Sequence, residues 1–221
     1  MESVTRKHSI ALIPARFAHY RYPVFRLLSN KDKNEFDLSI FADTKERLGI
    51  KLANFDVNKT NSKNEEIKWD RIKDIYINDV CFWQTGLLSI ALDKRYDTIV
   101  YWGEAHRIST WLSAIIARAR NKRILFWTHG LYGSEGWLKR TIRIKFYQLA
   151  DGLLVYSKHS RSLLEEESID PKKLFVINNS LDYKKQEKIY QSLSASALQK
   201  IKHELFKNSN KVLCFVGRLE K

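Results

Sequence analysis

The sequence has little cysteine and lacks the long apolar runs of membrane proteins. Only two cysteines, Cys81 and Cys214, occur among 221 residues, and neither has a Cys or His at metal-ligand spacing. Both lie in apolar contexts, so we expect buried thiols rather than a disulfide, in a reducing cytoplasm. No run of about 18 apolar residues is present, and the N-terminal apolar stretch is too short for a secretory signal. Any contact with a membrane would therefore be peripheral.

Several catalytic motifs are also missing. The sequence contains no G-x-S-x-G, G-x-x-x-x-G-K-[ST], C-x-x-C or H-E-x-x-H, and these are the central residues of serine hydrolases, P-loop proteins, thiol-redox enzymes and zinc proteases. Lys and Arg outnumber Asp and Glu by 39 to 25, giving a formal net charge of +14. This charge favours anionic partners such as a membrane surface. It includes no basic block of five or more residues, so a dedicated nucleic-acid role is not favoured.

What the sequence does contain is a sustained alternation of short apolar runs and helical patterns. Ser9–Ala15 is typical of a buried strand, and Tyr22–Asn30 has a helical pattern entered at Pro23. Strands separated by single helices predict an α/β fold, a Rossmann-like parallel sheet of six or seven strands with helices on both faces. The predicted strands are 9–15, 36–43, 74–80, 98–102, 122–130, 151–157 and 173–180. The predicted helices are 22–30, 83–97, 107–120, 137–150 and 158–168, and 57–68 is predicted to be a loop.

Within the predicted helix 107–120, an apolar stripe is expected to pack on the sheet. Its members are Ile108, Trp111, Leu112, Ile115 and Ile116.

The pattern changes after residue 180. Residues 181–210 are rich in Lys, Gln and Ser and predict a connecting helical segment, after which 211–216 again has the apolar character of a strand. About 11 residues cannot form a domain. We therefore expect an N-terminal domain at 1–180, a connecting segment at 181–210 and the first strand of a truncated second domain at 211–221.

Three stretches resemble family 4 glycosyltransferases of the GT-B type, in which two Rossmann-like domains face each other across a cleft. They are RILFWTHG at 123–130, ADGLLVYSKHSRSLLEEESIDPKKLFVINNSLD at 150–182, and KVLCFVGRLEK at 211–221. In that family the first domain ends in a strand followed by Asn, and the second opens with a strand ending in Gly-Arg-Leu. The resemblance implies that the chain holds the acceptor-side domain and stops just inside the nucleotide-sugar domain.

The resemblance also implies residue roles. His129 matches the cleft histidine that contacts the donor sugar, and Arg218, after Gly217, matches the arginine that pairs with the nucleotide diphosphate. Many relatives have a Gly-rich turn after the first strand; this chain has none, and Arg21 is a candidate substitute. The implied reaction retains the anomeric configuration and needs no metal and no cofactor beyond the nucleotide-sugar substrate.

Polar residues after other predicted strands would border the same cleft, because open parallel sheets bind ligands beyond the carboxyl ends of their strands. For Glu104 the roles of base or acceptor-orienting group compete with that of a carboxylate at a helix N-terminus. For His129 the alternative is a hydrogen bond within a turn, and for Arg21 a solvated loop. The candidates are His129 and Glu104 as catalytic residues, Tyr20, Arg21, Gly130 and Ser157 as acceptor-binding residues, and Gly217 and Arg218 as donor-binding residues, with no metal ligand.

The leading hypothesis is transfer of a sugar from a nucleotide sugar to a hydroxyl of a lipid-linked or polysaccharide acceptor. In the predicted helix 137–150, Trp137, Ile144 and Phe146 interleave with basic residues, which suits an anionic bilayer at the cytoplasmic face. A helix packed on the sheet is the alternative for this segment. Two other functions stay open, a noncatalytic module that binds a glycan or polyanion, and a nucleic-acid-binding module.

Overall fold

The computed structural model describes residues 7–30, 36–45, 52, 67–78, 80–131, 135–179, 182–206, 211, 213 and 215. The chain divides into two compact units, Met1–Leu181 and Asp182–Lys221. The first unit contains the sheet and every candidate residue up to Ser157. The candidates Gly217 and Arg218, and three of the six residues of the predicted strand at 211–216, lie outside the described residues.

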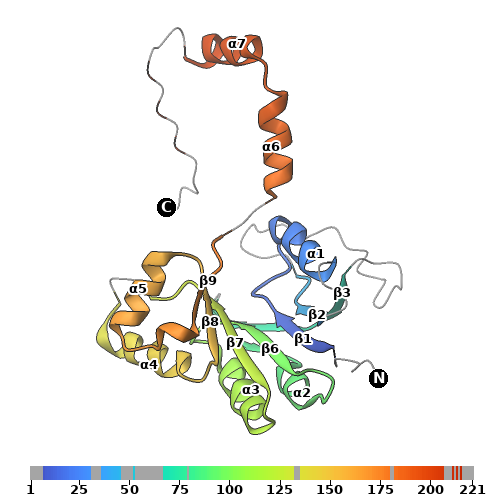
Figure 1. Ribbon diagram of the computed structural model, residues 1–221, viewed down its shortest axis with the longest axis vertical. Coiled ribbons are helices and arrows are strands. Elements are labelled where there is room, and N and C mark those ends of the chain that lie inside the picture. Colours follow the sequence, from blue (N-terminus) through green and yellow to red (C-terminus); the bar gives the residue numbers. More distant parts are fainter. Residues whose placement is uncertain are drawn as a thin grey trace, which may run out of the picture. The chain divides into compact units, whose positions relative to one another are not determined.

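The first unit is built on a seven-stranded sheet in the order β3-β2-β1-β6-β7-β8-β9. Every neighbouring pair is parallel, which confirms the predicted Rossmann-like α/β fold with helices on both faces (Figure 1). The strands are β1 His8–Ile13, β2 Phe36–Ala42, β3 Lys68–Arg71, β6 Thr98–Trp102, β7 Arg123–Thr128, β8 Gly152–Val155 and β9 Leu174–Val176. The helices are η1 His19–Arg21, α1 Tyr22–Asn30, α2 Leu87–Leu92, α3 Ile108–Ala119, α4 Trp137–Tyr147, α5 Lys158–Glu166 and η2 Pro171–Lys173.

Side chains alternate between two cores on opposite faces of the sheet, as the two-residue period of a strand requires. In β7, Phe126 packs in the core shared with α2, α3, α4 and α5, whereas Trp127 packs in the core shared with α1. The face toward α1 is aromatic at the strand ends, where Trp102, Trp127 and Tyr156 border the same core. The carboxyl ends of β6, β7 and β8 therefore present aromatic rings on one side of the sheet.

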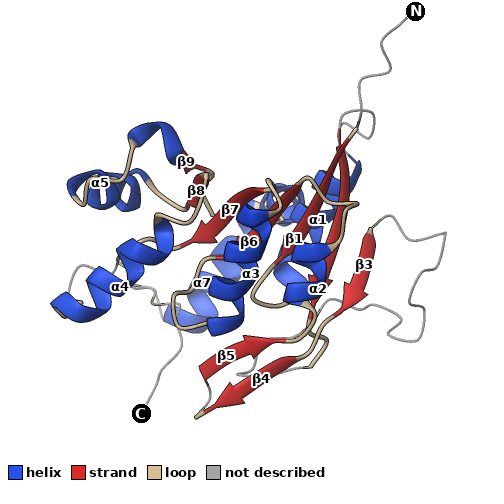
Figure 2. Ribbon diagram, turned by 90° about the horizontal axis from the view of Figure 1, so that it is seen from below, coloured by secondary structure: helices blue, strands red, loops and turns tan. Residues whose placement is uncertain are grey.

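The strand predicted at 74–80 is not part of the parallel sheet. Asp74–Ile77 and Val80–Gln84 form β4 and β5, a separate antiparallel hairpin (Figure 2). The seventh parallel strand is instead β3, whose first residue, Lys68, is the last residue of the predicted loop 57–68. The helix predicted from residue 83 begins later, at Leu87, because the preceding residues complete the hairpin.

Only part of the apolar stripe that was expected on α3 packs on the sheet. Ile108, Leu112 and Ile115 are exposed, while the buried residues of α3 are small or hydroxyl-bearing. Ser113 shows the reason, because its Oγ donates to the Leu87 carbonyl at 2.8 Å and also lies 2.7 Å from the Tyr101 hydroxyl. The helix packs closely through small side chains and paired hydroxyls. The predicted burial is therefore wrong for the three exposed residues, whereas Trp111 and Ile116 are partly buried against the core.

The second unit contains two helices, α6 Tyr183–Ser192 and α7 Ala195–Phe206. Both fall within 181–210, the segment predicted to be helical. Asp182 caps α6 by accepting a hydrogen bond from the Lys185 amide at 3.1 Å.

Candidate functional site

The strand order places a switch point between β1 and β6. From β1 the chain proceeds through β2 to β3 on one side, and from β6 it proceeds to β9 on the other. Ligands of open α/β sheets bind beyond the carboxyl ends of the strands at such a point. Arg21 follows β1, Glu104 follows β6 and His129 follows β7, so the fold brings these predicted residues to one edge of the sheet.

Arg21 lies at the centre of an aromatic cluster at this edge. Its Nη2 donates a hydrogen bond to the Tyr156 hydroxyl at 2.8 Å. Its guanidinium also lies 5.2 Å from the Trp127 ring centroid and 5.3 Å from that of Tyr156. Cation–π contacts of this kind are stronger when the cation is desolvated, and Arg21 is only 9% exposed. The alternative of a solvated basic loop is therefore wrong for Arg21. We call Arg21, Trp102, Trp127, His129 and Tyr156 the Arg21 cluster.

His129 is the solvent-exposed member of the Arg21 cluster. Its ring centroid lies 4.6 Å from that of Tyr156 and 6.0 Å from that of Trp102. Partial burial lowers the pKa of His129, and the positive charge of Arg21 lowers it further. The imidazole is thus biased toward its neutral form, which offers one hydrogen-bond donor and one acceptor to a ligand.

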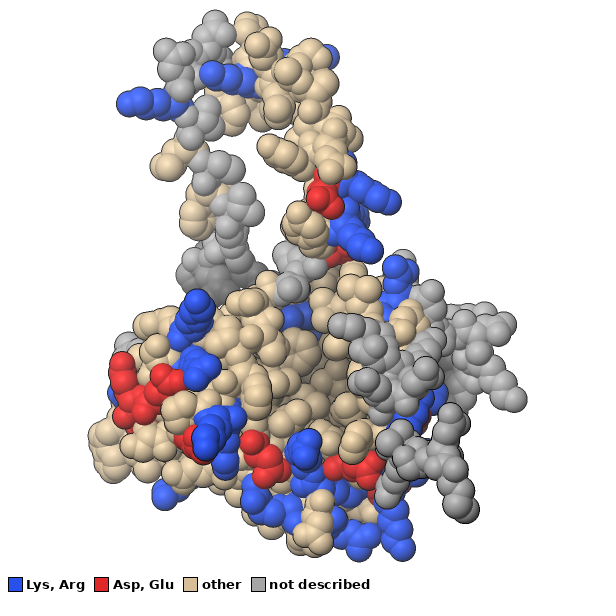
Figure 3. All heavy atoms as spheres, viewed as in Figure 1, with Lys and Arg blue, Asp and Glu red and all other residues tan. Residues whose placement is uncertain are grey.

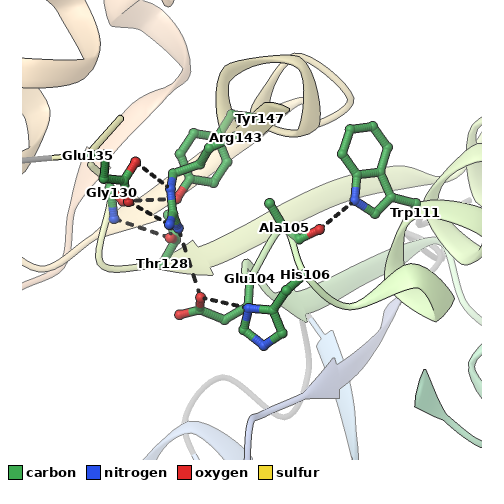
Figure 4. A network of polar contacts seen from close by, with 9 residues as sticks. All are labelled: Glu104, Ala105, His106, Trp111, Thr128, Gly130, Glu135, Arg143 and Tyr147. Atoms are coloured by element: carbon green, nitrogen blue, oxygen red, sulfur yellow. Dashed lines mark hydrogen bonds and ion pairs between the residues drawn. The ribbon is translucent and has the colours of Figure 1, made fainter. Parts of the chain in front are cut away.

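A buried hydrogen-bond network holds the turn that carries His129 (Figure 4). The Gly130 amide donates to Thr128 Oγ1 at 3.1 Å, the Thr128 and Tyr147 hydroxyls lie 2.7 Å apart, and the Tyr147 hydroxyl donates to the Gly130 carbonyl at 3.1 Å. Gly130 has φ +84°, and a Cβ there would lie 3.2 Å from Ser160 Cβ. Glycine is therefore required for this backbone conformation.

Glu104 belongs to a second polar network, which Figure 4 also shows. Its Oε2 lies 3.9 Å from Arg143 Nη1 and 3.7 Å from His106 Nδ1, and Arg143 Nη2 lies 2.6 Å from Glu135 Oε1. Burial raises the pKa of Glu104, while the charges of Arg143 and Arg107 oppose the shift. A carboxylate with a raised pKa suits proton transfer near neutral pH.

Two predicted acceptor-binding residues have local structural roles. Ser157 caps α5, because its Oγ accepts a hydrogen bond from the Ser160 amide at 3.1 Å. Tyr20 is exposed beside the Arg21 guanidinium, which lies 5.8 Å from its ring centroid. A role for either in acceptor binding stays a prediction, as it does for Gly130.

Sequence reasoning missed the partners of the predicted residues. Trp102, Trp127 and Tyr156 come from three different strands, and only the strand order shows that they meet around Arg21. The available signal was that each lies within three residues of the end of a predicted strand. Arg143 was one cation among four on α4 and carried no signal of its own.

Only one of the three apolar residues of α4 that were expected to contact a membrane is exposed. Trp137 is 78% exposed, but Ile144 is buried and Phe146 stacks on Phe126 at 4.3 Å. The other exposed apolar residues of α4 are Leu138 and Ile142. On the face shown in Figure 3, basic side chains alternate with acidic ones along the rim of the first unit.

Three further findings concern metal ligands, membrane-spanning helices and cysteines. Within the described ranges, no three His, Cys, Asp or Glu side chains gather as metal ligands. No described helix is long and apolar enough to cross a membrane. Cys81 is a buried free thiol, as predicted, whereas Cys214 lies outside the described residues.

Several solved structures share this fold at low sequence identity. The S. aureus MnaA-UDP co-structure matches with a TM-score of 0.54 and 14% identity over 88% of this chain and 51% of that chain. The UDP-GlcNAc 2-epimerase from Neisseria meningitidis bound to UDP-GlcNAc matches with a TM-score of 0.51 and 14% identity over 93% and 55%. Arabidopsis thaliana UGT89C1 complexed with UDP-L-rhamnose matches with a TM-score of 0.51 and 11% identity over 86% and 57%.

The chain spans about half the length of these solved proteins. None of the curated proteins matches its sequence. The model of Glycosyltransferase Family 4 matches residues 73–185, just over half of the chain, including the hairpin, β6 to β9 and both polar networks. The chain therefore belongs to glycosyltransferase family 4, with the fold of a GT-B type N-terminal domain.

Proposed function

We propose that this protein transfers a sugar from a nucleotide sugar to a hydroxyl group of a lipid-linked or polysaccharide acceptor. The observation that carries the proposal is the Arg21 cluster at the switch point, where a buried guanidinium and a neutral imidazole meet a set of aromatic rings. Aromatic rings stack on sugars, and a cation meets a diphosphate. Family membership and the UDP or UDP-sugars bound in the similar structures support the choice of donor.

In this proposal His129 hydrogen-bonds the donor sugar, and Glu104 orients the acceptor hydroxyl and takes its proton. The new bond forms between that oxygen and the anomeric carbon as the bond to the diphosphate breaks, and the nucleoside diphosphate leaves with the electron pair. Arg21 and, by family resemblance, Arg218 would stabilise the charge on the leaving group, beside Gly217. Retention of configuration and independence of metals are likewise expected from the resemblance.

The acceptor would be presented at the cytoplasmic face of a membrane, and α4 would contact the lipid. Trp137, Leu138 and Ile142 are exposed on α4, with the basic residues Lys139 and Lys145 exposed beside them. The helix has no acidic residue, so its exposed face suits an anionic interface.

The proposal is tested with the full-length protein and a panel of UDP-sugars, by following UDP release and the sugar product with and without glycan and lipid acceptors. His129→Ala is expected to lower kcat by about 10²–10³-fold, the usual effect of removing a group that stabilises the transition state. His159→Ala, at an exposed position of α5, is the matched control and should keep full activity. Absence of transfer with every common donor, or conversion of the donor to its epimer instead, would refute the proposal.

A further inference from the structure

The first turn of α3 contains two buried polar side chains that form no hydrogen bonds within the described part of the chain. Arg107, the N-cap residue, is 6% exposed, and its Nε and Nη1 have no partner there. Thr110, one turn along, is 1% exposed, and its Oγ1 likewise has none. Buried polar groups are nearly always paired, so two on one helical turn call for a physical reason.

Asp74 and Glu104, the two carboxylates on which the charge of Arg107 acts, have other partners. Asp74 accepts hydrogen bonds from Gln84 Nε2 at 2.9 Å and from the Tyr76 hydroxyl at 3.0 Å. Glu104 lies beside Arg143 in the network described above. The first turn of α3 lies between the hairpin and the loop after β6, because the Gln84 amide donates to Ser109 Oγ at 2.9 Å and the Arg107 amide donates to the Glu104 carbonyl at 3.1 Å. The charge of Arg107 opposes the rise that burial causes in the pKa of both acids. Its charge is close to acids without a direct ion pair to either.

A buried cation of this kind is costly unless it is paired. The guanidinium presents its donors in a planar fork that fits a phosphate or a carboxylate. The turn is also the N-terminus of a 12-residue helix that no side chain caps, where the helix dipole favours negative charge. The neighbouring His106 is exposed, so the turn borders the surface beside Glu104.

We propose that the first turn of α3 binds an oxyanion through Arg107 and Thr110. The site lies next to Glu104 at the switch point, so the ligand is an acceptor that carries a phosphate or a carboxylate group. The identity of the molecule bearing the oxyanion rests on the proposed function, whereas oxyanion binding at this turn does not.

The test measures anion binding by the 221-residue chain, without any assay of transfer. Inorganic phosphate and glucuronate are titrated separately at constant ionic strength, and the amide NMR signals of Ile108 and Ser109 are followed. Saturable shifts are expected for one anion or both, and the tighter one identifies the anionic group of the acceptor. Arg107→Gln should weaken binding by about 10-fold or more, since hydrogen bonds to charged groups are worth about 1.5–3 kcal/mol.

Thr110→Val keeps the test decisive if Arg107→Gln does not fold. The Thr110 hydroxyl forms no hydrogen bond within the described residues. The valine variant should therefore fold normally and bind the anion about 3- to 10-fold more weakly. Arg120→Gln, at the exposed C-terminus of the same helix, should bind like the wild type. Absence of saturable binding of both anions, or binding that neither Arg107→Gln nor Thr110→Val weakens, would overturn the proposal. The link to the acceptor is tested separately by the transfer assay of the proposed function: activity with uncharged acceptors only would overturn that link and leave the anion binding intact.

Discussion

Replacing Thr128 by Val tests whether the buried network holds the turn that carries His129. Thr128 is 1% exposed, and its Oγ1 bonds the Tyr147 hydroxyl and accepts from the Gly130 amide. Valine removes both hydrogen bonds and leaves the buried Gly130 amide without that acceptor. Two neutral hydrogen bonds at about 1 kcal/mol each, with the added penalty of an unpaired buried donor, give a loss of about 2–4 kcal/mol in the free energy of unfolding.

Thr110→Val is the matched control for this prediction. Thr110 is buried to the same extent as Thr128, but its hydroxyl has no partner among the described residues. The same substitution there removes a desolvated hydroxyl and should leave the protein at least as stable, with a gain of up to about 1 kcal/mol.

The assay is urea unfolding followed by far-UV circular dichroism, with the midpoint and slope fitted separately. A shift of the midpoint at constant slope shows a change in stability rather than in the unfolded state. Equal stabilities of Thr128→Val and Thr110→Val would refute the reasoning, because the two hydroxyls are equally buried and only that of Thr128 has hydrogen-bond partners among the described residues.

Three further substitutions probe the same edge of the sheet. Gly130→Ala should cost about 1–3 kcal/mol in urea unfolding, because the φ of +84° is strained for alanine and its Cβ would crowd Ser160; an unchanged midpoint would contradict this conformation. Arg21→Met should raise the pKa of His129 toward 6.5 in an NMR titration, since the charge of Arg21 contributes to lowering it. An unchanged pKa would contradict an electrostatic interaction between the two side chains. Glu104 has a raised pKa in the folded state, so the folded protein retains its proton to higher pH. Protonated Glu104 therefore contributes its full share to the free energy of unfolding below pH 4.5, the ordinary pKa. This contribution is lost as the pH rises through the raised pKa of the folded state. Glu104→Gln should flatten that decline, and parallel stability curves would contradict the shift.

The parts of the fold that sequence reasoning identified have strong local signals. β1 and α1 follow from an apolar run and a proline at the second helical position. β3 escaped notice because Trp69 is its only apolar residue, so pairing with β2 and burial decide its conformation. The orientation of α3 escaped because small residues and the paired hydroxyl of Ser113 face the sheet.

The candidate site was found one residue at a time but not as an arrangement. Arg21, Glu104 and His129 were recognisable because each follows a strand. Their partners Tyr156 and Arg143 depend on which elements lie side by side, and spacing along the sequence does not contain that information. Oxyanion binding at α3 depends in the same way on burial, which only the folded chain displays.

The most direct test of the central claim, that this edge of the sheet contacts the bound nucleotide sugar, is an NMR titration of the histidine side chains of the full-length protein with UDP-glucose and UDP-N-acetylglucosamine. The account predicts that the imidazole signals of His129 shift progressively with donor concentration, and that those of the exposed His159 on α5 do not. Arg21→Met should reduce the shift. Unchanged His129 signals at saturating donor, or equal shifts at both histidines, would contradict the account.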